Sequence, residues 1–326
     1  MFMEYVISKD GHGDFRSLQE AVDALPERNA DPCTLVLMPG IYRGRVIVNR
    51  DHLRIRGTDA KNTVLVHNGC AKDLNSEGRE KGTFLSYTLL VTGNDVTVED
   101  LTVQNDAGDG REVGQAVAVY AAGERGRWIN CRFIACQDTL FCGPTMPKVQ
   151  ADALPRKVPA GVPSVGDCPP VTGQQVFENC FIQGDVDFIF GPYACLFEHC
   201  TLFMNERGGW YTAANTPGAG LFGLVFRDCR LTGACAPGEA YLGRPWRAYA
   251  RTVFLNCEMD DHVAPAGFAD WDEVRVVTER YAEFGSRGAG ADTSHRHPEQ
   301  KLLTKEEADT LLPAINQFFE REGISE

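Results

Sequence analysis

Two carboxylates stand next to large apolar side chains in the segment GDVDFIFG, residues 184–191. Asp185 and Asp187 flank a valine, and the run Phe-Ile-Phe follows directly. An ionised carboxylate in such surroundings is costly to bury unless it is paired or hydrogen-bonded. The segment therefore raises the expectation of a carboxylate kept for chemistry, with a cation elsewhere in the chain to balance it.

Three further segments carry polar residues of catalytic types. They are GQAVAVY (114–120), CQDTLF (136–141) and YLGRPWRAY (241–249). Corresponding points of successive coils in a β-solenoid lie about 4.8 Å apart, so residues distant in sequence can meet there. If the segments occupy neighbouring coils, five side chains can converge: Gln115, Gln137, Asp138, Asp187 and Arg244.

Two carboxyl groups beside one arginine can divide the work of nucleophile and acid. Arg244 would pair with Asp187 and keep it ionised, because an opposite charge lowers a carboxylate pKa. Asp138, close to that anion and partly desolvated, would tend to hold a proton. The amides of Gln115 and Gln137 could donate hydrogen bonds to an oxyanion. Taken singly, the same residue types could be structural, with Asp capping turn amides and Gln forming ladders.

Short similar phrases recur along the chain and indicate the scaffold that would position these residues. Each pairs an apolar run with a polar residue, then Cys or Leu, then a second apolar alternation. The central positions are Leu101, Cys131, Cys180, Cys200, Cys229 and Cys257. Periods of roughly 20–30 residues built from short strands predict an all-β solenoid of the parallel β-helix type. The five cysteines would then stack in a buried column as small apolar residues.

The ends of a solenoid need covering, because a bare coil exposes unpaired strand edges. Capping boxes predict one helix over 17–25 and another over 304–320. Residues 143–172 hold seven prolines and are expected to form a projecting loop. That loop either borders a binding site or is a tolerated surface insertion. We expect a single domain over 1–326.

Composition limits the partners of the chain. Its net charge of −13 argues against nucleic acid, and no apolar run is long enough to span a membrane. The first residues lack a basic segment followed by an apolar one, which predicts a cytoplasmic protein, or a secreted one if a leader had been removed. Reduced cysteines and a monomer are expected. No Cys or His spacing is typical of a metal site, so no cofactor is expected.

The four segments, in this order, resemble the signature segments of the pectin methylesterase (pectinesterase) family of carbohydrate esterases. The pair DFIFG and LGRPW is the most specific part, and the resemblance extends over nearly the whole chain. It implies a single-stranded right-handed parallel β-helix with helices at both ends. It also implies hydrolysis of methyl esters on galacturonate units of pectin or methylated oligogalacturonides, with release of methanol. One departure is Gly44, where the family usually has glutamate.

The resemblance assigns a role to each polar residue of the constellation. Asp187 would be the nucleophile that attacks the ester carbonyl, oriented by Arg244. Asp138 would protonate the departing methanol and then act as base for the water that frees the enzyme. Gln115 and Gln137 would stabilise the tetrahedral intermediate.

Four further residues are candidate substrate contacts. Trp246 is expected to line a sugar subsite, and Thr83 and Trp210 match family contact positions in GTFLSYT and GGWYTAANT. Phe188 is the fourth candidate. By the same account Asp185 is only a turn residue.

Other functions remain open at this level. Pectate lyases and polygalacturonases are also β-helices, but a lyase usually needs a calcium-binding cluster of carboxylates, which the sequence does not display. No GxSxG elbow marks a Ser–His–Asp esterase. The alternatives that stay are an esterase or thioesterase on another substrate and a non-catalytic carbohydrate-binding solenoid.

Overall fold

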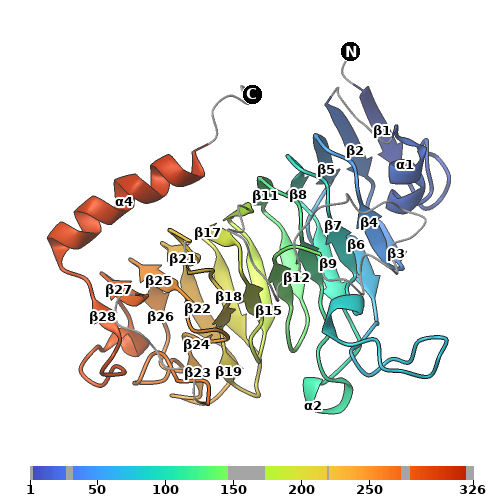
Figure 1. Ribbon diagram of the computed structural model, residues 1–326. Helices are drawn as coiled ribbons and strands as arrows, with labels where there is room; N and C mark the ends of the chain where they lie inside the picture. The colour runs from blue at the N-terminus through green and yellow to red at the C-terminus, as the bar shows by residue number, and fades with distance from the viewer. Residues whose placement is uncertain (1–2, 27–31, 146–172, 219, 273–279, 321–326) are drawn as a thin grey trace.

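A computed structural model describes residues 3–26, 32–145, 173–218, 220–272 and 280–320. Its strands lie side by side in long parallel sheets that follow one axis from the N-terminal end of the chain to the C-terminal part (Figure 1). Except at the two ends, successive strands of one sheet are separated in sequence by strands of the others, so the chain winds as a coil. The predicted parallel β-helix is confirmed.

The first sheet runs the full length of the coil. Its strands are β1 (Met3–Ile7), β2 (Cys33–Leu37), β5 (Leu53–Gly57), β8 (Thr97–Glu99), β11 (Gly126–Ile129), β14 (Gln174–Glu178), β17 (Ala194–Glu198), β21 (Leu224–Arg227), β25 (Thr252–Leu255), β27 (Tyr281–Phe284) and β28 (Lys301–Leu302).

The second sheet carries the segments that the sequence singled out. Its strands are β4 (Val46–Val48), β7 (Leu89–Val91), β10 (Val119–Ala121), β13 (Leu140–Cys142), β16 (Ile189–Gly191), β20 (Thr212–Ala214) and β24 (Arg244–Pro245).

The third sheet completes each coil, and a short fourth pair lies beside it. The third sheet holds β3 (Gly40–Arg43), β6 (Thr63–His67), β9 (Thr102–Asn105), β12 (Arg132–Ile134), β15 (Phe181–Gly184), β18 (Thr201–Met204), β22 (Arg230–Gly233) and β26 (Glu258–Met259); the pair is β19 (Gly209–Trp210) with β23 (Ala240–Tyr241).

The repeated phrases mark a tight turn between the first and third sheets. In each phrase the polar residue has a left-handed backbone, with φ between 53° and 55° at Asp100, Asn130, Asn179, His199, Asp228 and Asn256. Asn and Asp tolerate this conformation better than most residues, which explains their recurrence. The next residue then faces the interior.

The predicted cysteine column is confirmed as part of that interior. Cys131, Cys180, Cys200, Cys229 and Cys257 are all buried. The thiols of Cys180, Cys200 and Cys229 donate to backbone oxygens of the preceding coil at 3.3–3.4 Å. The cysteines therefore act as small apolar core residues with satisfied S–H groups.

A ladder of aromatic rings runs parallel to the cysteines. Phe177, Phe197, Phe226 and Phe254 stack with ring centroids 4.6 Å apart, and Trp128 continues the stack at 5.9 Å. Equivalent side chains of adjacent coils pack face to face because each coil repeats the register of the one before. The core is thus continuous along the axis, and it fixes the alignment of neighbouring coils.

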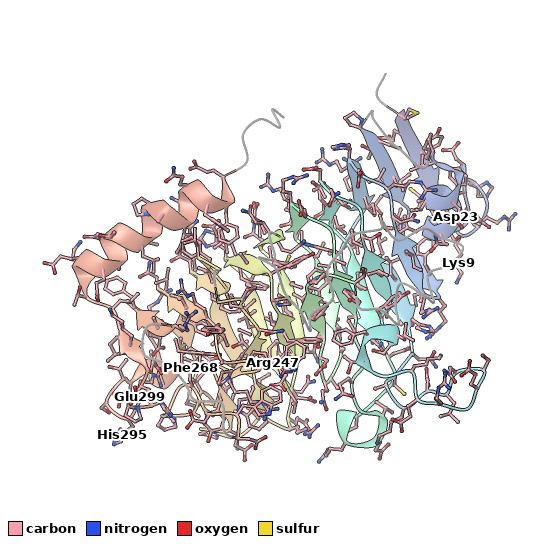
Figure 2. The ribbon with its side chains drawn as sticks, in the orientation of Figure 1. Lys9, Asp23, Arg247, Phe268, His295 and Glu299 are labelled. Carbon is pink, nitrogen blue, oxygen red and sulfur yellow. The ribbon has the colours of Figure 1, made fainter. Side chains whose placement is uncertain are left out.

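The N-terminal helix lies at one end of the coil as predicted, but the C-terminal helix does not cover the other end: it lies along the outer face of the first sheet, where its apolar side chains are buried (Figure 1). The helix α1 (Leu18–Ala24) begins after Ser17, whose hydroxyl accepts from the Glu20 amide, and buries Leu18 and Val22 against the core. Figure 2 shows Lys9 and Asp23 at this end and His295 and Glu299 at the other. The shorter helical turns are α2 (Gly110–Val113), η1 (Thr83–Leu85) and η2 (Ala289–Ala291).

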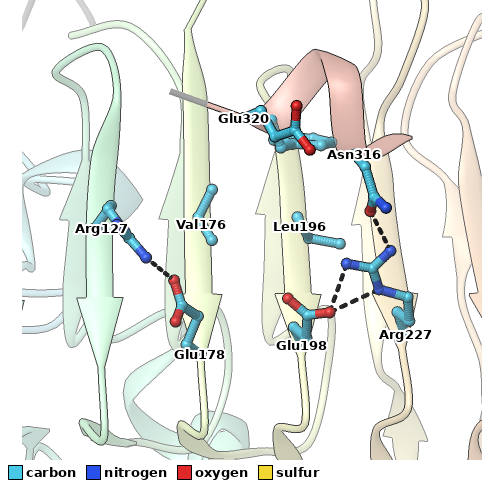
Figure 3. Close-up of a pocket in the computed structure, with 9 residues that line it drawn as sticks. Arg127, Val176, Glu178, Leu196, Glu198, Arg227, Asn316 and Glu320 are labelled. Carbon is cyan, nitrogen blue, oxygen red and sulfur yellow. Dashed lines mark hydrogen bonds and ion pairs between the residues drawn. The ribbon is translucent and has the colours of Figure 1, made fainter. Parts of the chain in front are cut away.

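The helix α4 (Lys305–Phe319) begins with a capping box of Thr304 and Glu307 and packs on the outer face of the first sheet. Its Asn316 accepts a hydrogen bond of 2.6 Å from Arg227, which also pairs with Glu198 (Figure 3). Among the described residues no helix is long and apolar enough to cross a membrane. The predicted proline-rich loop falls mainly on 146–172, outside the described residues.

Candidate active site

A row of outward-facing side chains crosses the second sheet. The register aligns, coil by coil, Ile47, Leu90, Tyr120, Phe141, Phe190, Ala213 and Arg244. The apolar members form a cluster separate from the interior core. Arg244 is the charged member and ends the row, so its guanidinium lies on the same outer face as the aromatic rings.

Asp138 and Asp187 occupy equivalent positions in adjacent coils. The ladder pairs Leu140 with Ile189, and counting back two residues places Asp138 opposite Asp187. The Asp138 amide donates to the oxygen of Val186 at 3.1 Å, which holds the two turns together. Both aspartates have left-handed backbones, with φ of 64° and 52°. Asp tolerates the left-handed conformation better than most residues. The turn therefore favours the same residue type that supplies the carboxyl group.

Arg244 makes a two-point contact with Asp187. Its Nε and one terminal nitrogen donate to the two carboxylate oxygens at 2.9 and 2.7 Å. The aspartate side chain is 9% exposed, so the charge-assisted pair is shielded from water. Burial raises the pKa of Asp187, while the hydrogen bonds and charge of Arg244 oppose that rise. Arg244 thus acts on the pKa of Asp187 in the predicted direction, but burial has the larger effect and the net shift is upward.

Asp138 is buried, and among the described residues no cation pairs with it as Arg244 pairs with Asp187. Burial raises the pKa of Asp138 well above its usual range, and the neighbouring charge of Asp187 raises it further. Arg244 offsets only part of this effect. The two carboxyls thus differ in the predicted sense: Asp138 is the one that keeps a proton, and Asp187 is the one that ionises.

The two glutamines come from adjacent coils beside this pair. The amide of Ala116 donates to the oxygen of Gln137 at 3.1 Å, which sets Gln115 and Gln137 one coil apart. Both side chains are half-buried. A β-carbon at Gly110, the first residue of α2, would lie 2.9 Å from the Gln137 side chain, so that close approach requires glycine. The side chain of Gln137 hydrogen-bonds Asp138, so its amide lies beside the two carboxyls.

Two of the predicted substrate contacts lie over the aromatic row. Trp246 packs edge-on against Phe190 with ring centroids 6.0 Å apart. Thr83 opens η1, whose Phe84 packs on Phe141 at 5.0 Å. Both Thr83 and Trp246 are half-buried.

Of the other two predicted contacts, Phe188 is wrong and Trp210 stays a prediction. Phe188 has no exposed surface and packs against Tyr211 in the interior at 5.2 Å, so it cannot touch a ligand in this structure. It follows Asp187 in the chain, and successive side chains near a strand point to opposite faces. Trp210 lies at the site, but the Arg244 guanidinium covers its ring at 3.8 Å.

One residue was missed by the sequence reasoning. Trp271 lies with its ring centroid 3.9 Å from the Arg244 guanidinium carbon. The one sequence feature that could have pointed to Trp271 is that three of the chain's four tryptophans, Trp271 among them, lie outside the repeated phrases. Asp185 is the expected turn residue, since it accepts from the Val186 amide at 2.7 Å; Arg207 also approaches it to 4.0 Å. In the described ranges no cluster of three or more His, Cys, Asp or Glu side chains could hold a metal ion.

Comparison with known proteins agrees with the fold and the motifs. The Pectinesterase family profile matches residues 4–145 and 170–318. Pectinesterase 31 of Arabidopsis thaliana is 31% identical over 311 residues, which cover 93% of this chain and 88% of the relative. Pectinesterase QRT1 of the same plant is 30% identical over 316 residues, covering 94% and 75% of the two chains.

Solved structures agree with this match. The pectin methylesterase from carrot is 25% identical, with a TM-score of 0.76 over 99% of this chain and 98% of that one. A pectin methylesterase in complex with a hexasaccharide has a TM-score of 0.79 at 24% identity, over 98% of each chain.

The predicted cytoplasmic location is wrong. The plant pectinesterases that this chain matches are cell-wall enzymes, which conflicts with a cytoplasmic assignment.

Proposed function

This chain belongs to the pectinesterase family, and we propose that it hydrolyses methyl esters of galacturonate units in pectin or methylated oligogalacturonides, releasing methanol. The observation that carries this proposal is the two-point pairing of Arg244 with Asp187 one coil away from Asp138. It supplies an ionisable nucleophile beside a carboxyl group that keeps its proton. An ester hydrolase with an aspartate nucleophile needs both.

In the first half of the proposed reaction, a carboxylate oxygen of Asp187 attacks the ester carbonyl carbon. The negative charge that develops on the carbonyl oxygen is stabilised by hydrogen bonds from the amides of Gln115 and Gln137. The intermediate collapses as the bond to the methoxy oxygen breaks, and Asp138 gives that oxygen its proton. Methanol leaves, and the galacturonyl group stays on Asp187 as an anhydride.

In the second half, Asp138 acts as the base. It removes a proton from a water molecule that attacks the anhydride carbonyl, and the glutamine amides stabilise the second oxyanion. Cleavage of the anhydride releases galacturonate and restores the carboxylate of Asp187 and the protonated Asp138. The sum is one water consumed and one methanol and one carboxylic acid formed.

Trp246 and Thr83 are the proposed sugar contacts. Trp246 supports this role because its half-buried ring continues the apolar row next to Arg244, and aromatic faces suit the apolar faces of sugar rings. We further propose that the whole chain 1–326 is one domain that acts as a monomer. Sedimentation of the purified protein and a single cooperative unfolding transition would support both statements; a dimer or two transitions would refute them.

Methanol release from methylated oligogalacturonides of defined length tests the reaction. We expect release by the unchanged protein without chain cleavage, and its loss in Asp187→Asn and Asp138→Asn, which keep the side-chain shape. Both variants should still bind oligogalacturonide, because neither removes the aromatic contacts. Chain cleavage, or turnover that survives Asp187→Asn, would contradict the assigned reaction.

A further inference from the structure

The guanidinium of Arg244 is held between two indole rings. Its carbon lies 3.8 Å from the ring centroid of Trp210 and 3.9 Å from that of Trp271. Two rings this close to one planar group cannot share a face, so they cover its opposite faces. We infer that Trp210 and Trp271 are positioning residues, which hold Arg244 in the plane where it forms both hydrogen bonds to Asp187. This inference rests on the proposed function.

The topology explains why Arg244 needs support. Strand order places β20 between β16 and β24, so Arg244 must reach across a whole coil to meet Asp187. Trp210 belongs to the coil that is crossed, since its strand β19 leads into β20. Trp271 belongs to the next coil, because Gly243 pairs with Phe268 there. The coils on both sides of Arg244 therefore each contribute one ring.

Packing against neighbouring side chains also holds both indole rings in place. Trp210 stacks on Tyr241, its partner in the β19–β23 pair, with centroids 6.0 Å apart and planes 16° apart. Trp271 packs against the apolar cluster of the second sheet. The rings replace water on both faces of the cation while leaving its edge free for the carboxylate, and a cation over an indole face is attracted by the ring quadrupole.

The arrangement distinguishes this role from a sugar contact. A face of Trp210 that covers the guanidinium is not available to a sugar ring. A sugar contact would act mainly on substrate binding. A positioning ring acts instead on Asp187, because Arg244 is the group that opposes the rise of its pKa on burial. Loss of a ring should therefore change the ionisation of Asp187.

Four variants separate these roles: Trp210→Met and Trp271→Met fill the space without an aromatic face, and Trp210→Phe and Trp271→Phe keep one. We expect each Met variant to lower kcat for methanol release by about tenfold, which is about 1.4 kcal/mol. In the pH profile of kcat/KM, the acidic limb of each Met variant should move to higher pH, because an Arg244 that is held less firmly stabilises the ionised form of Asp187 less. KM should change less than twofold, and the Phe variants should keep most of kcat.

Trp128→Phe is the matched control for a purely structural effect. Trp128 is buried in the core stack and its indole donates to Gln175, so its loss should lower stability and leave the acidic limb in place. Carbon-13 NMR of the Asp187 carboxyl gives a readout without turnover: its pKa should rise in both Met variants.

Three results would overturn the inference. They are a higher KM with unchanged kcat in the Met variants, a loss of rate with an unmoved acidic limb, and an unmoved pKa of Asp187. If the unchanged protein released no methanol, the proposed function would fail, and the NMR titration would still decide whether the rings act on the Arg244–Asp187 pair.

Discussion

Replacing Arg244 by methionine should convert the buried ion pair into a lone buried carboxylate. Asp187 and Arg244 are 9% and 18% exposed, and two charge-assisted hydrogen bonds join them. Breaking a buried pair by removing one partner costs about 3–5 kcal/mol. Because Arg244 is the group that opposes the effect of burial, its removal should raise the pKa of Asp187 further.

The sign of the pH dependence follows from that rise. The pKa of an aspartate in the unfolded chain is about 3.9. Near that pH, Asp187 is protonated in the folded variant, and the variant loses little folding stability. Above that pH, Asp187 ionises in the unfolded chain but keeps its proton in the folded variant. The folding stability of the variant therefore falls as the pH rises toward the pKa of Asp187 in the folded state. The difference in unfolding free energy between the two proteins should grow from near zero at pH 4 to about 3–5 kcal/mol at pH 8.

Urea unfolding at pH 4 and pH 8 measures this difference, and methanol release across the same range should show an acidic limb displaced to higher pH. Arg287→Met is the matched control. Arg287 pairs with Glu258 on the surface, where both side chains are well exposed, and such pairs contribute about 0–1 kcal/mol. Equal destabilisation of the Arg244 variant at both pH values would refute the account of Asp187 as a buried anion held by one cation.

Two further predictions concern the oxyanion and the turns. Gln137→Ala should lower kcat by about 10²–10³ with little change in KM, since its amide is assigned to the transition state, and steady-state kinetics would contradict this if KM alone rose. Asn179→Ala should cost about 1–2 kcal/mol because of its left-handed backbone at φ 53°, whereas Asn179→Gly should cost less. Equal unfolding free energies for these two variants would argue against backbone strain as the cause.

The repeat could be predicted from the sequence because each coil requires the same backbone conformation and the same kind of side chain at the same position. A left-handed turn followed by an inward position selects Asn or Asp and then a small apolar residue, as at Asn130 and Cys131. Such a demand recurs many times, so it stands out without any knowledge of the structure. The stacked cysteines and the parallel sheets followed directly from it.

The site was readable only in part. Asp138, Asp187 and Arg244 lie in distinctive segments, but the direction of a side chain near a turn is not encoded in its type, and Phe188 was misplaced for that reason. Trp271 stands in no repeated phrase, and only the fold brings it to Arg244. The pKa of Asp187 depends on a balance between burial and one cation, which needs coordinates.

Because Arg244 reaches across one whole coil, catalysis depends on the number of coils between β16 and β24. A solenoid of this kind can gain or lose a complete winding and still bury its core, because every interior position meets an equivalent neighbour. One winding added between β16 and β24 would displace the guanidinium by about 4.8 Å, more than a hydrogen bond can follow. Lengthening the scaffold should therefore be harmless at either end. It should inactivate the protein here, and also between β13 and β16, where it would separate Asp138 from Asp187.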